Sequence, residues 1–253
     1  MQAMQAWIGD PKGDAMDVIN DDIKALLRKC SVATLSTQLF KRGLRNTVIQ
    51  GVRQLARGSG LMVGEAFTLR YIPAREDLDH VGVFNDPNHP QRKAIEAAPP
   101  GQVLICDCRG DASAASGGSI LMTRLMKRGV AGFVSDGGLR DSPEIANLTF
   151  PVYYGGPAPM LNLARHHAVD MNVPIACGGV AIFPGDVLVG DGEGVIVVPR
   201  HLAAEVAADA AAQEQLEEFV IEEVRNGASI VGTYPPKEAA LQRYQDWLKK
   251  RGK

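Results

Sequence analysis

The length, composition and charge of this 253-residue chain are those of an ordinary globular protein. Apolar residues make up 45% and charged residues 22%, and the chain is long enough to bury a large core. The formal net charge of −2 excludes the strong basic field of a protein that binds nucleic acid or an anionic membrane. The four cysteines lack the spacing of a zinc site, and neither a signal peptide nor a membrane span is recognisable. We therefore expect a cytoplasmic protein with buried thiols.

The first part of the chain is predicted to be an arm followed by two helices and a strand. Residues 1–15 are expected to form a flexible N-terminal arm, and residues 16–253 a single domain. Helical spacing predicts helices over residues 17–27 and 31–43, the second with Ser31 as a possible cap and Gly43 as a possible stop. Alternating residues 65–72 predict a strand. The segments "ARED", "NDPNHP" and "APPG" then mark loops, because they are rich in proline and polar residues.

The rest of the chain alternates between predicted strands and helices. The predicted strands are 101–108, 130–135 and 150–156, followed by a set of short strands over 178–199. The predicted helices are 119–129, one capped by Ser142 with Pro143 in its first turn, 201 to about 224, and one from about 237 onwards. This order predicts a mixed α/β domain that ends in C-terminal helices.

The stretch "ASGGSIL", residues 115–121, leads from a predicted strand into a predicted helix. Gly117 and Gly118 allow the backbone to approach a ligand closely. The unpaired N–H groups of the helix's first turn favour an anion, such as a carboxylate or a phosphate. The alternative is a plain tight connection without a ligand.

The stretch "SDGGLRDSPE", residues 135–144, follows a strand that we expect to end at Ser135. Its polar residues would then lie beyond the carboxyl end of a strand, where open α/β sheets bind ligands. Arg140 offers a planar fork of donors for a carboxylate, and Asp141 offers oxygen ligands for Mg²⁺. A metal beside a guanidinium can stabilise an enolate. The alternative is a solvated charged turn.

Other candidate motifs are weaker. "GDGEG", residues 190–194, lacks the pattern of a phosphate-binding loop and is interpreted as a β-turn. His166 and His167 are adjacent on a presumed helix, so they would point to different faces and are not expected to share a metal. His80 and His89 lie in a predicted polar loop and could touch a substrate.

Three segments together carry a resemblance to a known family. "GVAGFVSDGGLRD", "FPVYYGG" and "NVPIACGGVAIFPGDVLVGDGEGVIVVP" resemble the RraA-like superfamily, over roughly residues 20–230. That superfamily includes the 4-hydroxy-4-methyl-2-oxoglutarate aldolases and the regulators of ribonuclease E activity. The resemblance implies a three-layer β/β/α sandwich of the swivelling-domain type with N- and C-terminal helices. It also implies a homotrimer or hexamer, in which Glu214 and Glu217 could approach a neighbour's site.

The resemblance implies roles for the residues already singled out. The arginine that matches Arg140 binds the pyruvoyl part of the substrate, and the aspartate that matches Asp141 ligates Mg²⁺ or Mn²⁺. The loop of Gly117, Gly118, Ser119, Ile120 and Leu121 would hold the substrate's carboxylate through its backbone amides. Many members carry an acidic residue where this chain has Ser119. We therefore expect Ser119 to affect proton transfer, weakening aldol cleavage more than decarboxylation, or to act as a helix cap.

The function implied is that of a class II, metal-dependent pyruvate aldolase that does not form a Schiff base. It would cleave a 4-hydroxy-2-oxo acid by a retro-aldol reaction, with oxaloacetate-type decarboxylation as a side activity. Arg140, Asp141 and Ser119 are the candidate catalytic residues. One alternative is a non-catalytic regulator that binds ribonuclease E or another protein. Another is different enolate chemistry on a sugar-derived 2-oxo acid.

Overall fold

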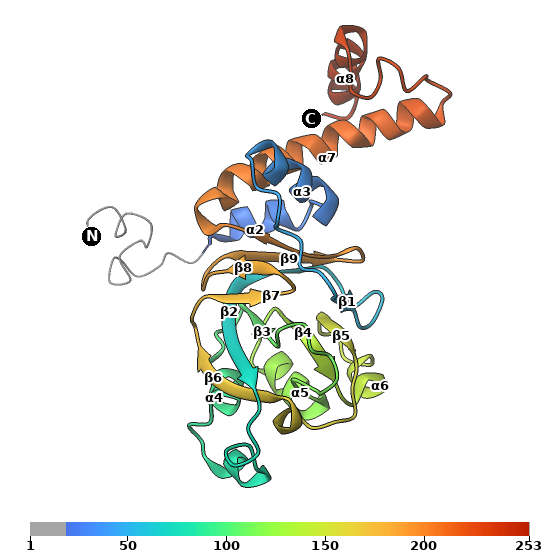
Figure 1. The fold of residues 1–253 in the computed structure, drawn as a ribbon. Helices are drawn as coiled ribbons and strands as arrows, with labels where there is room; N and C mark the ends of the chain where they lie inside the picture. The colour runs from blue at the N-terminus through green and yellow to red at the C-terminus, as the bar shows by residue number, and fades with distance from the viewer. Residues whose placement is uncertain (1–18, 253) are drawn as a thin grey trace, which may run out of the picture.

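Four parallel strands form the middle of the protein in the computed structural model, which describes residues 19–252 (Figure 1). Their spatial order is β5 (Val152–Pro157), β4 (Gly132–Leu139), β3 (Val103–Asp107) and β2 (Met62–Pro73). Antiparallel strands flank them, with β1 (Arg53–Gln54) beside β5 and β6 (His166–Met171) beside the end of β2. All eight residues of β4 and all five of β3 are buried, as expected for strands covered on both faces.

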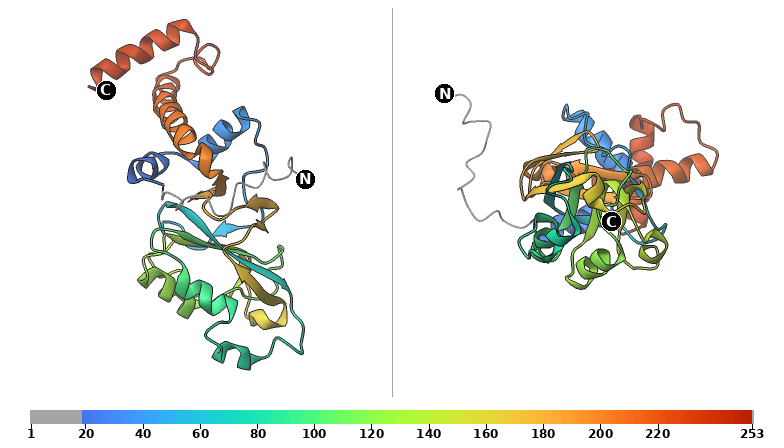
Figure 2. Two further views of the ribbon diagram at one scale, coloured as in Figure 1. Left: turned by 90° about the vertical axis from the view of Figure 1, so that its left-hand side faces the viewer. Right: turned by 60° about the horizontal axis from the view of Figure 1, so that its bottom comes forward.

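A second β layer covers one face of these strands. The start of β2 pairs with β9 (Val187–Asp191), which pairs with β10 (Gly194–Val198), while β7 (Ile175–Cys177) and β8 (Val180–Ile182) form a separate hairpin. Because β2 takes part in both layers, the sheet curves into a nearly closed, barrel-like form (Figures 1 and 2). Apolar side chains from both layers meet in one buried cluster that includes Ile105, Val134 and Leu188.

Three helices cover the other face. They are α4 (Pro90–Ala97), α5 (Ser119–Lys127) and α6 (Ser142–Ile145), and each connects two successive parallel strands. Ile95 of α4 and Met122 and Leu125 of α5 pack against Phe133 of β4 in a second cluster. The layers are therefore β, β and α, and the predicted three-layer fold class with helices at both ends is confirmed.

The terminal helices pack on the outside of β9 and β10. These helices are α2 (Asp21–Leu27), α3 (Val32–Lys41) and α7 (Ala203–Arg225), whose side chains form a third cluster with the strands. Figure 1 shows the far end of α7 leaving the body, where α8 (Glu238–Lys250) folds back on it through Phe219, Tyr244 and Trp247. Short 3₁₀ helices occur at η1 (Val81–Asn85), η2 (Asn162–Ala164) and η3 (Arg200–Leu202). None of the helices within residues 19–252 combines the length and hydrophobicity needed to cross a bilayer.

Many predicted elements are confirmed by the structure. Helix α3 has the Ser31 side chain as its cap, accepting the N–H of Thr34, and Gly43 follows it with φ 84°. The predicted strands at 65–72, 101–108 and 150–156 correspond to β2, β3 and β5, and "GDGEG" is the turn between β9 and β10. The predicted arm, residues 1–15, lies outside the described residues. Residues 17 and 18, where the first helix was predicted to begin, also lie outside them, and the helix is observed from Asp21.

Four local predictions were wrong. The strand expected to end at Ser135 continues to Leu139, because Gly138 and Leu139 pair with the end of β5 and Gly138 also forms a bridge with Ala115. His166 and His167 lie in strand β6, not in a helix, because this segment pairs with the edge of β2. Ser142 is the first residue of α6 and Asp141 is the N-cap. Helix α4 was not predicted, because the proline-rich segments on both sides of it were interpreted as loops. The first of these segments supplies the proline at the start of the helix.

Candidate active site

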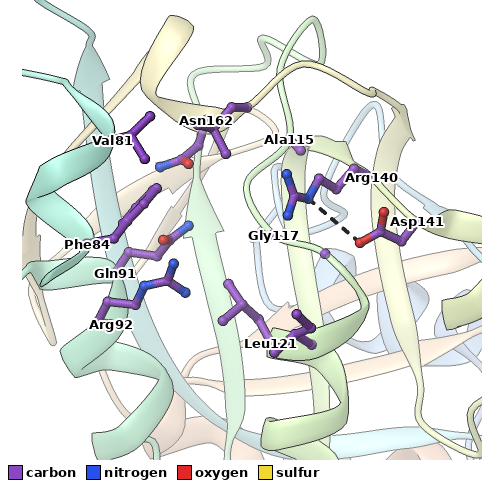
Figure 3. Close-up of a pocket in the computed structure, with 13 residues that line it drawn as sticks. Val81, Phe84, Gln91, Arg92, Ala115, Gly117, Leu121, Arg140, Asp141 and Asn162 are labelled. Carbon is purple, nitrogen blue, oxygen red and sulfur yellow. Dashed lines mark ion pairs between the residues drawn. The ribbon is translucent and has the colours of Figure 1, made fainter.

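One edge of the parallel sheet collects the residues that the sequence singled out. The carboxyl ends of β2 to β5 lie at this edge, and the helices that follow β2, β3 and β4 begin there. A pocket of about 400 Å³ opens between them. Six predicted site residues line it: Gly117, Gly118, Ile120, Leu121, Arg140 and Asp141 (Figure 3). Ser119, the remaining one, touches the carboxylate of Asp141 through its backbone and side chain.

Asp141 turns the chain sharply after β4. It has left-handed backbone angles, φ 57° and ψ 29°, which aspartate tolerates better than most residues. Its Oδ2 accepts the N–H of Ser119 at 3.1 Å and the hydroxyl of Ser119 at 3.3 Å. The Nε of Arg140 lies 3.7 Å from the same oxygen, as the dashed line in Figure 3 marks. The carboxylate therefore binds the start of α5 and pairs with its neighbouring arginine.

Close packing requires the two glycines, Gly137 and Gly138, that precede Arg140 and Asp141 in β4. A Cβ on Gly137 would lie 2.7 Å from the Sγ of Cys108, and a Cβ on Gly138 would lie 2.8 Å from the carbonyl oxygen of Ala112. Neither glycine has a positive φ, so neither is required by a turn. The lack of side chains lets the loop before α5 lie against β4, where the N–H of Ser116 donates to the carbonyl of Gly138 at 2.8 Å.

Helix α5 begins without a side-chain cap of its own. Its N-cap is Gly118, so the expectation that Ser119 caps this helix was wrong, and Asp141 accepts the N–H of Ser119 instead. A Cβ on Gly118 would lie 2.6 Å from Asp141 Oδ2, which explains the glycine at this position. Within residues 19–252 the N–H groups of Ile120 and Leu121 have no acceptor. They can hold an anion beside Arg140.

A divalent cation fits the donors that the site provides. Asp141 has 38% of its side chain exposed and is the one acidic residue among the described residues that line the pocket. Its Oδ2 is hydrogen-bonded, whereas no hydrogen bond involves Oδ1 within residues 19–252. The same part of the chain has no cluster of three or more residues that could cage a metal. Mg²⁺ is commonly bound by one or two carboxylates and completed by water and substrate oxygens, so Asp141 suits it.

Among the pocket residues that sequence reasoning missed, four have a polar or aromatic side chain. Figure 3 shows Phe84, Gln91 and Arg92 on the wall opposite Arg140, with Asn162 above them. Phe84 belongs to η1, Gln91 and Arg92 to α4, and Asn162 to η2. The helical spacing of the buried Gln91, Ala94 and Ile95 was a usable signal for α4. No pattern in the sequence marks Asn162.

The histidines considered from the sequence lie outside this pocket. His89 is buried beside Phe84, and its pKa is lowered by burial and by the charge of Arg92. His80 is exposed. His166 Nε2 lies 3.3 Å from the carbonyl of Ala114, and His167 Nδ1 lies 2.8 Å from Asp79 Oδ1. All four cysteines are buried free thiols, as predicted.

Glu214 and Glu217 make contacts within their own subunit. An oxygen of Glu214 accepts the N–H of Ser31 at 2.8 Å, at the start of α3. Glu217 accepts a hydrogen bond from Gln213 at 2.8 Å, one turn earlier on α7. A role of either residue in a neighbouring subunit's site stays a prediction.

Comparison with known proteins gives a consistent result. A family model described as RraA-like, Aldolase/RraA, matches residues 32–197. A 4-hydroxy-4-methyl-2-oxoglutarate aldolase from Thermus thermophilus is 31% identical over 118 residues, 47% of this chain and 71% of that protein. A Halalkalibacterium halodurans relative is 39% identical over 109 residues, 43% of this chain and 51% of its own length. The chain spans 34% of another relative, protein DlpA of Legionella pneumophila, at 25% identity over 88% of this chain.

Solved structures share the fold over most of the chain. An uncharacterised protein from Pseudomonas syringae has a TM-score of 0.74 and 28% identity, covering 86% of this chain and 98% of its own. Streptomyces coelicolor RraAS2, described as an unusual member of the RNase ES inhibitor RraA protein family, has a TM-score of 0.71 and 30% identity. It covers 81% of this chain and 98% of its own.

Proposed function

The chain belongs to the RraA-like family, and from that premise we propose that it is a divalent-metal-dependent pyruvate lyase. It would cleave a 4-hydroxy-2-oxo acid by a retro-aldol reaction, with oxaloacetate-type decarboxylation as a side activity. The observation that carries the proposal is the convergence of Arg140, Asp141 and the first turn of α5 on one pocket. The aldolase name of the Thermus relative supports it.

Two groups of this chain would bind the 2-oxo acid end of the substrate. The N–H groups of Ile120 and Leu121 can donate to its carboxylate, since they have no acceptor within residues 19–252. Arg140 lies beside them and adds a planar, permanently charged donor. Asp141 would hold the cation, and a bound divalent cation would act as a Lewis acid on the 2-oxo group.

Arg140 would also carry the chemical step. When the bond between C3 and C4 breaks, its electron pair moves to the 2-oxo acid fragment and leaves an enolate. A guanidinium already held at the pocket wall stabilises this new negative charge without having to reorganise. Decarboxylation of oxaloacetate produces the same enolate, which accounts for the proposed side activity.

Proton transfer would depend on water. Among the described residues that line the pocket there is no histidine and no carboxylate other than Asp141. We therefore assign the proton of the C4 hydroxyl to a water molecule. No lysine lines the pocket in the same part of the chain, which favours an enolate over a Schiff base.

The direct test is pyruvate release from a panel of 4-hydroxy-2-oxo acids. Activity should require Mg²⁺ or Mn²⁺, disappear in EDTA and return when the metal is restored. Borohydride should not trap a substrate adduct. Full activity in EDTA, or a trapped adduct, would contradict the proposed mechanism.

The similarity to Streptomyces RraAS2 favours a second candidate, a regulator that binds ribonuclease E or a related enzyme. A regulator would inhibit RNA cleavage in a purified assay whether or not Arg140 is intact. If an Arg140 variant lost both the inhibition of RNA cleavage and the release of pyruvate, both effects would instead be assigned to one site.

A further inference from the structure

One side chain of the pocket has a hydrogen-bond donor that the protein leaves unused. Asn162, in η2, lines the pocket together with Arg140 (Figure 3), and it is only 3% exposed. Its Nδ2 has no acceptor within residues 19–252. Gln91, which lines the same pocket, differs because its Nε2 donates to the carbonyl of Ser116 at 2.9 Å. A buried amide without an acceptor is unfavourable, and a ligand that supplies one removes this cost.

Asn162 has a fixed position relative to the start of α5. The carbonyl of Met160, which precedes η2, accepts the N–H of Ala115 at 2.9 Å. The Nε2 of His166, which follows η2, lies 3.3 Å from the carbonyl of Ala114. Both contacts join the segment around η2 to the loop that leads into α5. Asn162 is thus held beside the helix start that is proposed to bind the substrate's carboxylate.

The proposed function leaves one reacting oxygen of the substrate without a protein partner. Ile120, Leu121 and Arg140 are proposed to bind the 2-oxo acid end, and Asp141 to hold the cation there. The oxygen on C4 remains. It is a hydroxyl in the substrate and a carbonyl in the product, and both forms accept a hydrogen bond. An amide N–H suits this oxygen, because it donates without taking the hydroxyl proton, which a water molecule removes.

We propose that Asn162 is a further catalytic residue, which donates a hydrogen bond from Nδ2 to the C4 oxygen. When water takes the hydroxyl proton, the O–H electron pair forms the second bond of the C4 carbonyl, and the C3–C4 pair passes to pyruvate as its enolate. The enolate then takes a proton from water at C3. Negative charge develops on the C4 oxygen as its proton leaves, and a fixed donor stabilises that charge. This inference rests on the proposed function, because it takes Arg140 and α5 as the binding site for the 2-oxo acid end.

Decarboxylation of oxaloacetate provides the comparison, because the charge at C4 changes in the opposite direction. The C4 carboxylate of oxaloacetate loses its negative charge when it departs as CO₂. A donor to its oxygens therefore stabilises the reactant more than the transition state. Loss of the Asn162 donor should slow retro-aldol cleavage without slowing decarboxylation.

The test measures both reactions in Asn162→Leu, because leucine is close to asparagine in size and cannot donate. In Mg²⁺, kcat for cleavage of 4-hydroxy-2-oxoglutarate should fall at least tenfold, since loss of one preorganised donor usually costs about 10² to 10³ in rate. The kcat for oxaloacetate decarboxylation, measured above the rate in Mg²⁺ alone, should equal or exceed that of the wild type. Tm should not fall, because an apolar side chain replaces a buried donor without an acceptor.

Asn88→Leu is the matched control, since Asn88 is exposed and lies outside the pocket. This variant should keep both rates. Asn162→Ala serves as a second variant if Asn162→Leu does not fold. Unchanged cleavage, or an equal loss of both activities, in a folded Asn162 variant would overturn the role of this residue and leave the proposed function intact. If the wild type does not cleave the 4-hydroxy-2-oxo acid, the proposed function fails and the role of Asn162 with it.

Discussion

The left-handed conformation of Asp141 decides how the two charged residues of the site are arranged. With φ 57° at this residue, the chain leaves β4 and enters α6 directly, and the carboxylate turns back toward α5. Arg140 stays at the strand end, where its N–H donates to the carbonyl of Gly117 at 3.2 Å. Two residues that are adjacent in the chain can thus serve an anion and a cation at different positions of one pocket.

Ser119 lies beside the proposed metal ligand. Its hydroxyl is 3.3 Å from Asp141 Oδ2, so an acidic residue here would place a second carboxylate against Asp141. Such a pair repels unless a cation lies between the two groups. Serine therefore leaves one negative charge where many relatives of this chain are expected to have two. Its effect on proton transfer stays a prediction.

We predict that Arg140→Lys lowers kcat by about 10² to 10³, the usual effect of losing one preorganised donor to a developing oxyanion. Lysine keeps the charge but lacks the planar fork that matches a carboxylate. Steady-state pyruvate release, measured on protein with an unchanged circular dichroism spectrum, checks this. Arg57→Lys, at an exposed position outside the pocket, is the control and should behave as the wild type. A near-normal kcat for Arg140→Lys would refute the role given to the guanidinium.

At the scale of elements, the site depends on the contact between β4 and the loop that precedes α5. Gly138 and Ala115 form a parallel bridge, and the N–H of Gly138 donates to the carbonyl of Ala114 at 3.1 Å. Ser116 adds a side-chain hydrogen bond to the carbonyl of Gly138 at 3.0 Å. The loop thus behaves as a further strand beside β4, and the start of α5 is placed against Arg140 and Asp141.

At Gly118 this loop lies close to Arg140 and Asp141, and we predict that Gly118→Ala disrupts the site. The new Cβ would lie 2.6 Å from Asp141 Oδ2 and 3.0 Å from Arg140 Cγ, so both side chains must move. Since a displacement of about 1 Å can cost about 10²-fold in rate, we expect kcat/KM to fall at least tenfold with little change in Tm.

The control for this variant is Gly192→Ala in the turn between β9 and β10. A Cβ there meets no atom within 4 Å, and its φ is not positive. This variant should leave both kcat/KM and Tm near their wild-type values. If Gly118→Ala keeps full activity, the close approach of the loop to Arg140 and Asp141 is not required for catalysis.

At the scale of the whole molecule, the buried Asp136 connects the layers behind the site. Its carboxylate accepts the N–H groups of Cys108, Gly110 and Gly178, which belong to the loop after β3 and to the hairpin of β7 and β8. Burial raises the pKa of Asp136, and the three N–H donors oppose that rise. The aspartate of the "SDGG" motif thus supports the position of β4 within the fold and does not enter the pocket.

We predict that the protein is a homotrimer or a hexamer in solution. The family resemblance motivates this, together with α7, whose far end leaves the body and has exposed apolar residues at Ile221 and Val224 (Figure 1). Multi-angle light scattering should give three or six times the 27.1 kDa mass of one chain. A fully active monomer would contradict the prediction.

The sequence by itself determined most of the elements and half of the pocket. Helical and alternating periodicity located α3, α5 and the buried strands, because a side chain's position along one element depends only on local spacing. Arg140 and Asp141 were predicted to lie beyond the carboxyl end of a strand, where open α/β sheets bind ligands, and the glycine loop was predicted to favour an anion. The motif resemblance then identified the fold class.

Only the tertiary structure decided the other half of the pocket and the true ends of some strands. Strand β4 extends to Leu139, and His166 lies in a strand, because each pairs with a segment distant in the sequence. Arg92 and Asn162 meet Arg140 only when α4 and η2 fold back to the same edge of the sheet. Local periodicity contains no information on such contacts, since they form between elements whose relative positions are determined by packing of the whole core.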